Sequence, residues 1–243
     1  MGKLIVVGIG PGNYENMTVR ADRALKNCDT IIGYTVYVDL VRDRYPDKEY
    51  FDTPMTREAE RCRMAIEEAR KGKTVAMVCS GDSGIYGMAA LIYELRGEEN
   101  DPEVEVIPGL TAACSGGALL GAPLTHDFAV ISLSDRLTPW ERILKRVECA
   151  ALADLSIVLY NPRSKGRPHN LRMACEKLLE ILPAERPCGV ARNIGREGEA
   201  CSFMTLAQLR DADIDMFSTV FIGNAQTRMI GGNLITPRGY RDV

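Results

Sequence analysis

Short apolar runs alternate with helical patterns along almost the whole chain. Eight runs have the composition and the flanking turn residues that are typical of buried strands. These runs are residues 4–7, 30–32, 74–79, 104–107, 128–133, 156–160, 188–192 and 219–222. Because helical patterns separate them, the sequence predicts an α/β fold with mainly parallel strands.

Three of the intervening stretches have clear helix signatures. Residues 56–71 place Ala59, Cys62, Ile66 and Ala69 on one face and are followed by a glycine that suits a helix C-terminus. Residues 139–152 begin with a proline, which favours the first helical position, and residues 168–182 stop before another proline.

A change in charge accompanies a candidate domain boundary at Gly121-Ala122-Pro123. Residues 1–121 contain 14 basic and 19 acidic residues, a net charge of −5, whereas residues 122–243 contain 16 and 14, a net charge of +2. We therefore predict two α/β domains, residues 1–121 and 122–243, neither of which is a copy of the other.

The composition excludes several classes of protein. The chain has 243 residues, of which 46% are hydrophobic and 26% charged, which is too apolar for intrinsic disorder. No apolar run approaches the roughly 18–20 residues that span a bilayer, and the N-terminus lacks a segment of signal-peptide length. The net charge of −3 disfavours nucleic acid as a partner. We expect a cytoplasmic protein.

The cysteines do not form a metal-binding pattern. All eight are scattered without a CxxC pair, and the chain has two histidines. The sequence therefore predicts no metal site, and most of the cysteines are expected to pack as small apolar side chains.

The glycine-rich loop after the first strand, Gly8-Ile9-Gly10-Pro11-Gly12, does not fit a dinucleotide site. The G-x-G-x-x-G pattern requires glycine where Asn13 stands, and Pro11 removes a backbone donor. Gly72-Lys73-Thr74 lacks the first glycine of a P-loop and precedes a strand. The acidic-G-x-G-x-G loop of the commonest methyltransferase fold is also missing from the sequence.

Two further loops follow predicted strands and enter predicted helices. They are Cys79-Ser80-Gly81-Asp82-Ser83-Gly84-Ile85-Tyr86-Gly87 and Pro108-Gly109-Leu110-Thr111-Ala112. Carboxyl ends of strands are where open α/β sheets bind ligands. Asp82 is expected either to cap the helix or to accept a hydrogen bond from a ribose. The small residues after the third loop suit either close helix packing or an adenosine-sized ligand.

The three loops together resemble the tetrapyrrole methylase family, the S-adenosylmethionine-dependent methyltransferases of corrin and sirohaem synthesis. The G-x-G-P-G, G-D-[PS]-x-x-Y-G and P-G-[ILV]-[ST]-A motifs occur in this order, and the resemblance covers residues 3–236. Residues 32–40, 79–89, 126–135, 137–140 and 160–165 narrow it to a branch that methylates carbon 17 of the macrocycle and promotes ring contraction.

The resemblance implies a two-domain fold, a homodimer, and S-adenosylmethionine bound in a cleft between the domains. It implies a cofactor site made of Ile9, Gly10, Pro11, Gly81, Asp82, Ile85, Thr111, Ala112, Asn161, Asn193 and Asn224. Methyl transfer from a sulfonium to carbon is an in-line displacement that depends mainly on alignment, so a nucleophilic Ser or Cys is not required.

The substrate implied by the family is a tetrapyrrole with many acetate and propionate arms. Residues 135–172 contain eight basic and four acidic residues, and Arg136, Arg163 and Lys165 lie in predicted loops where they can bind carboxylates. Ser134, Asp135 and Ser164 are further substrate candidates. His126, Asp127 and Tyr34 are candidates for the proton transfers of ring contraction, with a structural role as the alternative for His126 and Tyr34.

Other functions stay open at this point. They include methylation at a different ring carbon, and a module that binds S-adenosylmethionine without transferring its methyl group. An RNA methyltransferase of the same family is disfavoured by the acidic first half, and a nucleotide-dependent oxidoreductase by Asn13 and Pro11. The sequence does not distinguish a cobalt-containing substrate from a metal-free one.

Overall fold

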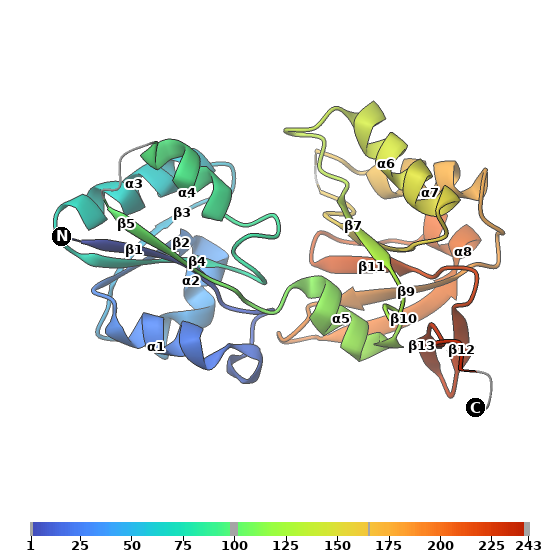
Figure 1. Cartoon of the computed structure of the whole chain (residues 1–243), viewed down its shortest axis with the longest axis horizontal. Coiled ribbons are helices and arrows are strands. Elements are labelled where there is room, and N and C mark those ends of the chain that lie inside the picture. Colours follow the sequence, from blue (N-terminus) through green and yellow to red (C-terminus); the bar gives the residue numbers. More distant parts are fainter. Residues whose placement is uncertain (1, 98–101, 165, 241–243) are drawn as a thin grey trace. The chain divides into compact units, whose positions relative to one another are not determined.

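The computed structural model describes residues 2–97, 102–164 and 166–240, which form two compact units. The first unit is Met1–Ala112 and the second is Ala113–Val243 (Figure 1). The division therefore falls after Ala112 rather than after Gly121. Its cause is helix α5 (Ala112–Leu120), since a Cβ atom on Gly116 would touch Ile194, Phe221 and Ala191 of the second unit.

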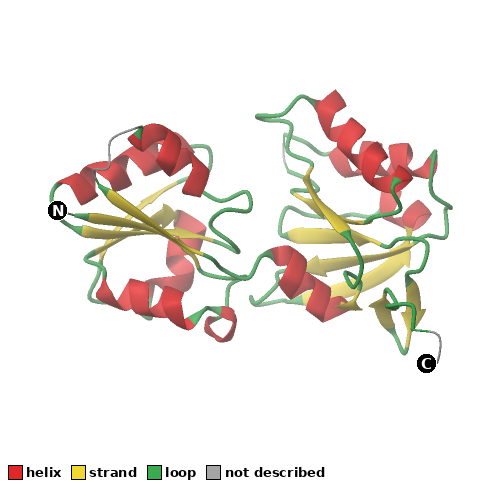
Figure 2. Cartoon of the chain, in the orientation of Figure 1, coloured by secondary structure: helices red, strands yellow, loops and turns green. Residues whose placement is uncertain are grey.

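The first unit is a parallel sheet covered by helices on both faces (Figures 1 and 2). Its strand order is β3-β2-β4-β1-β5, and every pair is parallel. The strands are β1 (Lys3–Gly8), β2 (Thr30–Tyr34), β3 (Glu49–Thr53), β4 (Thr74–Cys79) and β5 (Glu103–Ile107). The helices are α1 (Val19–Asn27), α2 (Thr35–Arg42), α3 (Glu58–Arg70) and α4 (Ala89–Arg96), with a 3₁₀ turn, η1 (Tyr14–Asn16).

Alternate side chains of each central strand enter two separate apolar layers. Ile5 and Val7 of β1 pack in the layer with α1 and α2, whereas Leu4 and Val6 pack in the layer with α3 and α4. Because both faces are covered, the central strands read as continuous apolar runs rather than as alternating ones. This explains why β1 and β4 were predictable from the sequence.

The second unit has a mixed sheet, so the expectation of mainly parallel strands is wrong for this half. Its order is β10-β9-β11-β8-β7, and only β7 and β8 are parallel neighbours within it. Its strands are β7 (Phe128–Ser132), β8 (Ser156–Tyr160), β9 (Pro187–Arg192), β10 (Ala200–Thr205) and β11 (Ser218–Ile222). The connection from β9 to β10 is a loop without a helix, and a short loop of this kind joins antiparallel neighbours.

The second unit buries one face of its sheet under α6 (Trp140–Leu152), α7 (Asn170–Leu179) and α8 (Leu206–Arg210) (Figure 1). The other face contacts α5, and a small sheet formed by β6 (Gly121–Ala122), β12 (Arg228–Ile230) and β13 (Asn233–Ile235) lies beside it. Gly116 and Gly117 let α5 approach Phe221 closely, so the small residues after the third loop serve helix packing.

Candidate functional site

The first two glycine-rich loops are joined at the carboxyl edge of the parallel sheet in the first unit. Gly10 and Gly81 form an antiparallel bridge, with N···O distances of 3.1 and 2.7 Å. The N–H of Ile9 donates to the carbonyl of Cys79 at 2.9 Å, while the Ile9 side chain is buried in the core. A ligand at this edge therefore meets the backbone of these loops rather than the Ile9 side chain.

Three glycines of different loops pack directly against one another. A Cβ atom on Gly8 would lie 2.6 Å from the amide nitrogen of Gly109 and 2.8 Å from the carbonyl oxygen of Gly81. A Cβ on Gly109 would overlap that same carbonyl oxygen. The space beside Gly8 and Gly109 is therefore filled by main chain, and these two glycines are required for the loops to meet.

The Asp82 carboxylate ties the second loop to the third. Its Oδ1 accepts hydrogen bonds from the amides of Gly84 (2.8 Å) and Ile85 (3.0 Å), and its Oδ2 accepts one from the amide of Gly109 (2.9 Å). Helix α4 starts only at Ala89, so Asp82 is not its N-cap. Of the two roles expected for Asp82, the capping one is wrong, and the bonds that the structure gives it organise the loops.

The outer surface of the joined loops suits an adenosine-bearing cofactor. Ile85 and Leu110 are apolar but 42% and 39% exposed, although the backbone amide of Ile85 is held by Asp82. A Cβ atom on Gly84 would meet only Asp82 Oδ1, at 3.3 Å, so the backbone there is open to close approach. Exposed apolar side chains beside accessible backbone groups are the features of a small-molecule site. The residues of these loops thus fit an adenosine-bearing cofactor.

Tyr34 lies at the same carboxyl edge, at the end of β2 and the start of α2. Its ring packs edge-on against Tyr37 with the centroids 5.0 Å apart. The guanidinium of Arg61 is 6.0 Å from the Tyr34 ring centroid and donates to Thr53 Oγ1 at 2.8 Å and to the Thr53 carbonyl at 3.2 Å. A cation thus lies buried next to the candidate proton donor.

Sequence reasoning missed Arg61, which is only 4% exposed. The signal was its position: Arg61 precedes Ala65 by four residues and lies next to Cys62, within the apolar stripe of α3. A charged residue in register with buried positions needs a polar partner inside the fold. Thr53, at the end of an edge strand that the pattern did not predict, provides it.

In the second unit, the carboxyl ends of β7, β8 and β9 lie at one edge of the sheet, because these strands run in the same direction. Asn161 and Asn193 directly follow β8 and β9, and both have left-handed backbone conformations, with φ of 54° and 49°. Asn161 Nδ2 donates to Ser132 Oγ at 2.9 Å. Positive φ outside glycine is concentrated at functional loops in many proteins.

Ser134 and Asp135 follow β7 at this edge and are held by Arg167. The guanidinium of Arg167 donates to Ser134 Oγ at 2.8 Å and lies 3.8 Å from Asp135. Ser164 exchanges two backbone hydrogen bonds with Arg167, which closes a tight turn after β8. Arg136 is exposed, and Lys165 lies outside the described residues.

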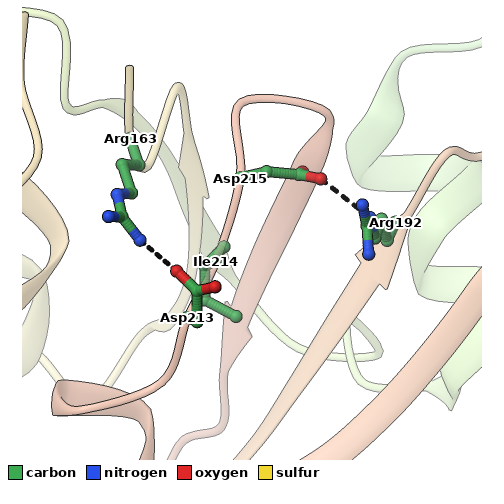
Figure 3. A pocket seen from close by; sticks show the side chains of 5 residues that line it. All are labelled: Arg163, Arg192, Asp213, Ile214 and Asp215. Carbon is green, nitrogen blue, oxygen red and sulfur yellow. Dashed lines mark hydrogen bonds and ion pairs between the residues drawn. The ribbon is translucent and has the colours of Figure 1, made fainter. Parts of the chain in front are cut away.

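Arg163 lines a hollow of about 240 Å³ together with Arg192, Asp213, Ile214 and Asp215 (Figure 3). Arg163 forms an ion pair with Asp213, and Arg192 Nε lies 2.7 Å from Asp215 Oδ2. Arg192 ends β9 beside Asn193 and was not singled out from the sequence, because it stands at the end of an apolar run.

His126 and Asp127 precede β7, and Asn224 follows β11, so all three lie at the opposite edge of the second sheet from Asn161 and Asn193. A five-residue strand separates the two edges by roughly 17 Å. His126 Nε2 donates to the carbonyl of Pro237 at 2.8 Å. Asn224 Oδ1 accepts from Gln226 N and Thr227 Oγ1 within a turn. The catalytic role of His126 and Asp127 stays a prediction, and the bond to Pro237 supports a structural role for His126.

Replacing His126 with alanine is expected to lower stability more than activity. The variant loses a hydrogen bond worth about 1 kcal/mol, which corresponds to a fall in Tm of roughly 2–4 °C for a chain of this size. We expect kcat to change by less than about threefold, since proton transfer by a general acid or base contributes about 10²–10⁴-fold. A drop of a hundredfold at unchanged Tm would instead establish His126 as catalytic.

The buried cysteines are expected to be unreactive. Burial raises the pKa of the Cys62 and Cys175 thiols to about 12 and that of Cys28 and Cys79 to about 11. These thiols stay protonated near neutral pH and pack as apolar groups. Among the described residues, no group of three or more His, Cys, Asp or Glu side chains is arranged to hold a metal ion.

Comparisons with known proteins identify the family of this chain. The family model of the Tetrapyrrole (Corrin/Porphyrin) Methylases matches residues 3–210. A probable cobalt-factor III C(17)-methyltransferase of Salmonella typhimurium is 47% identical over 98% of this chain and 99% of that protein. A precorrin-3B C(17)-methyltransferase of Sinorhizobium sp is 38% identical over 98% of this chain and 97% of that protein.

A solved structure agrees with these relatives. In the crystal structure of the methyltransferase CobJ, the sequence is 37% identical to this one. The match covers 98% of this chain and 100% of the CobJ chain, with a TM-score of 0.90. Some other relatives are longer, and the chain spans 45% to 53% of their length. The match of the family model over most of the sequence and the identity of these relatives lead to one conclusion: the chain belongs to the tetrapyrrole (corrin/porphyrin) methylases.

Proposed function

We propose that the protein transfers a methyl group from S-adenosylmethionine to carbon 17 of cobalt-factor III, or of its metal-free counterpart precorrin-3B, and couples this transfer to ring contraction in cobalamin biosynthesis. The observation that carries the proposal is the loop edge of the first unit, where Gly8, Gly81 and Gly109 meet and Asp82 ties the second loop to the third. The names of the similar C(17)-methyltransferases supply the position of methylation.

The loops of the first unit would hold the cofactor. Its sulfonium supplies an electrophilic methyl group, so the protein's task is alignment rather than nucleophilic attack. The backbone of Gly10, Pro11 and Gly81 and the exposed side chain of Ile85 would contact it, while Asp82 keeps the loops in register. Thr111, Ala112, Asn161 and Asn193 belong to the same proposal. Ile9 would contribute through its main chain.

The second unit would bind the carboxylate arms of the tetrapyrrole. Arg163 and Arg192 line the hollow beside Asp213, and Arg136 is exposed in the loop after β7. Arginine binds carboxylates through paired N–H donors, and an array of them attracts a polyanion. Ser134, Asp135 and Ser164 lie on neighbouring loops of this edge, where Arg167 holds them.

Tyr34 is the residue that we propose for proton transfer during ring contraction. It lies at the same edge of the first unit as the glycine loops, and the buried guanidinium of Arg61 is near its ring. A tyrosine hydroxyl can serve as a general acid or base when it is positioned at the reacting group. His126 and Asp127 are weaker proposals, since His126 donates to the main-chain carbonyl of Pro237 and both residues lie at the opposite edge of the second sheet from Asn161.

A homodimer, which the family resemblance implies, and a cytoplasmic location complete the proposal. In the part of the chain that the structure describes, no helix is long and apolar enough to cross a membrane.

The test is anaerobic incubation of the protein with S-adenosylmethionine and cobalt-factor III, followed by mass and absorbance spectra of the tetrapyrrole. We expect a gain of one methyl group and a shifted spectrum. Reaction with metal-free precorrin-3B alone would assign the protein to the metal-free substrate. Methylation of another tetrapyrrole at a different carbon, or binding without transfer, would contradict the proposed position or the proposed activity.

A further inference from the structure

Two ion pairs flank a single buried residue at the carboxyl edge of the second sheet. Ile214 is buried in the core of the second unit, and the aspartates on either side of it each face an arginine (Figure 3). Asp213 pairs with Arg163 of the loop after β8, and Asp215 pairs with Arg192 at the end of β9. All five residues line the same hollow of about 240 Å³.

The two aspartates are held very differently. Asp215 Oδ1 accepts hydrogen bonds from Phe217 N at 3.0 Å and Ser218 Oγ at 2.9 Å, so its carboxylate is fixed in a turn while Oδ2 faces Arg192. The Asp213 side chain is 95% exposed and pairs with Arg163. Exposed pairs of this kind contribute little to stability because water screens them.

The side chain of Asp213 is a carboxymethyl group, which is chemically the same as an acetate arm of a tetrapyrrole. We propose that Asp213 is an internal competitor that occupies Arg163 until a carboxylate arm of the substrate displaces it. Arg192, held in place by Asp215, is a second cation of the same subsite. This inference rests on the proposed function in one respect, namely that the ligand is a polycarboxylate macrocycle.

The Asp213→Asn variant distinguishes the two possible roles of Asp213. Removal of a competitor raises the affinity for a polycarboxylate, whereas removal of a structural partner lowers it. If Asp213 competes, its removal frees the Arg163 guanidinium, and the affinity for a polycarboxylate rises by about two- to fivefold, the range expected for one exposed ion pair. The Arg163→Ala variant removes the cation and lowers the affinity by about five- to tenfold. In the Arg163→Ala background, the Asp213→Asn substitution has no further effect.

The experiment measures binding of uroporphyrin III, a stable porphyrin with acetate and propionate arms, by fluorescence titration. The wild type, both single variants, the double variant and Arg192→Ala are compared. Asp211→Asn is the matched control, because it removes one exposed aspartate from an ion pair with Arg210 outside the hollow and changes the net charge equally. Unfolding temperature and S-adenosylhomocysteine affinity verify that each variant is folded.

Tighter binding by Asp213→Asn alone, weaker binding by Arg163→Ala and Arg192→Ala, and an unchanged Asp211→Asn support the inference. Equal gains in Asp213→Asn and Asp211→Asn would reduce it to a general charge effect and overturn it. Weaker binding by Asp213→Asn, or no binding by the wild type, would also overturn it. If the binding pattern holds but methylation of cobalt-factor III and precorrin-3B fails, the subsite stands and the proposed function falls.

Discussion

Asp82→Asn is expected to weaken binding of S-adenosylhomocysteine by about ten- to a hundredfold. Asparagine keeps one oxygen for the amides of Gly84 and Ile85, but its NH₂ group would face the Gly109 N–H, which now donates to Asp82 Oδ2. Two donors then oppose each other where a charge-assisted hydrogen bond stood. Losing such a bond and leaving a donor unpaired costs about 1.5–3 kcal/mol, which is enough to separate the second loop from the third.

The measurement is calorimetric titration of wild-type and variant protein with S-adenosylhomocysteine. Asp29→Asn is the matched control, because Asp29 Oδ2 accepts a backbone hydrogen bond from Thr74 N at 2.7 Å at the opposite edge of the same sheet. We expect Asp29→Asn to leave the affinity unchanged. Equal losses in both variants would mean that the whole domain has weakened, and an unchanged affinity in Asp82→Asn would contradict the role of this carboxylate in shaping the site.

Gly109→Ala is expected to lower the free energy of unfolding by roughly 3 kcal/mol or more, at the upper end of overpacking effects. The added Cβ would overlap the carbonyl oxygen of Gly81 and lie 2.7 Å from the carbonyl carbon of Gly8. Both neighbours are main chain in loops that are tied to central strands, so neither can rotate away as a side chain would. The loops must separate to admit one methyl group.

Denaturant unfolding followed by circular dichroism checks this expectation. Gly166→Ala is the control, because a Cβ at Gly166 would have no neighbour within 4 Å. A change of less than about 0.5 kcal/mol is expected there, as for other surface substitutions. If Gly109→Ala unfolds at the wild-type denaturant concentration, the contact among the three glycines does not constrain the fold as we describe.

The central strands of both units were predictable because burial on both faces leaves an uninterrupted apolar run. All eight expected runs lie within observed strands or extend them by one residue, as β1, β4 and β8 illustrate. The edge strands β3 and β10 were missed, because two of the five residues of β3 and three of the six residues of β10 are exposed, and polar residues interrupt the apolar pattern of each strand. Strand direction in the second unit was also beyond the pattern, since it depends on how the chain turns between strands.

The loops of the candidate site could be found from their glycines, but the reason for those glycines could not. Gly8 and Gly109 are 101 positions apart, and only the folded sheet shows that each excludes a Cβ on the other. Arg192 and Asp215 could not be linked for a similar reason, because their contact depends on the order of the strands in the second sheet. Arg61 alone could have been found from the sequence, because it is a charged residue within the apolar stripe of a predicted helix.

The contact among Gly8, Gly81 and Gly109 also bears on how such a chain can diverge. In a packed core, an enlarged side chain can be offset by a smaller one opposite, which opens routes for second-site suppressors. Here the opposing atoms are those of the peptide unit, which every residue carries, so no exchange at the partner positions restores the lost space. In a lineage that acquires a side chain at Gly109, only reversion to glycine restores this contact at these positions.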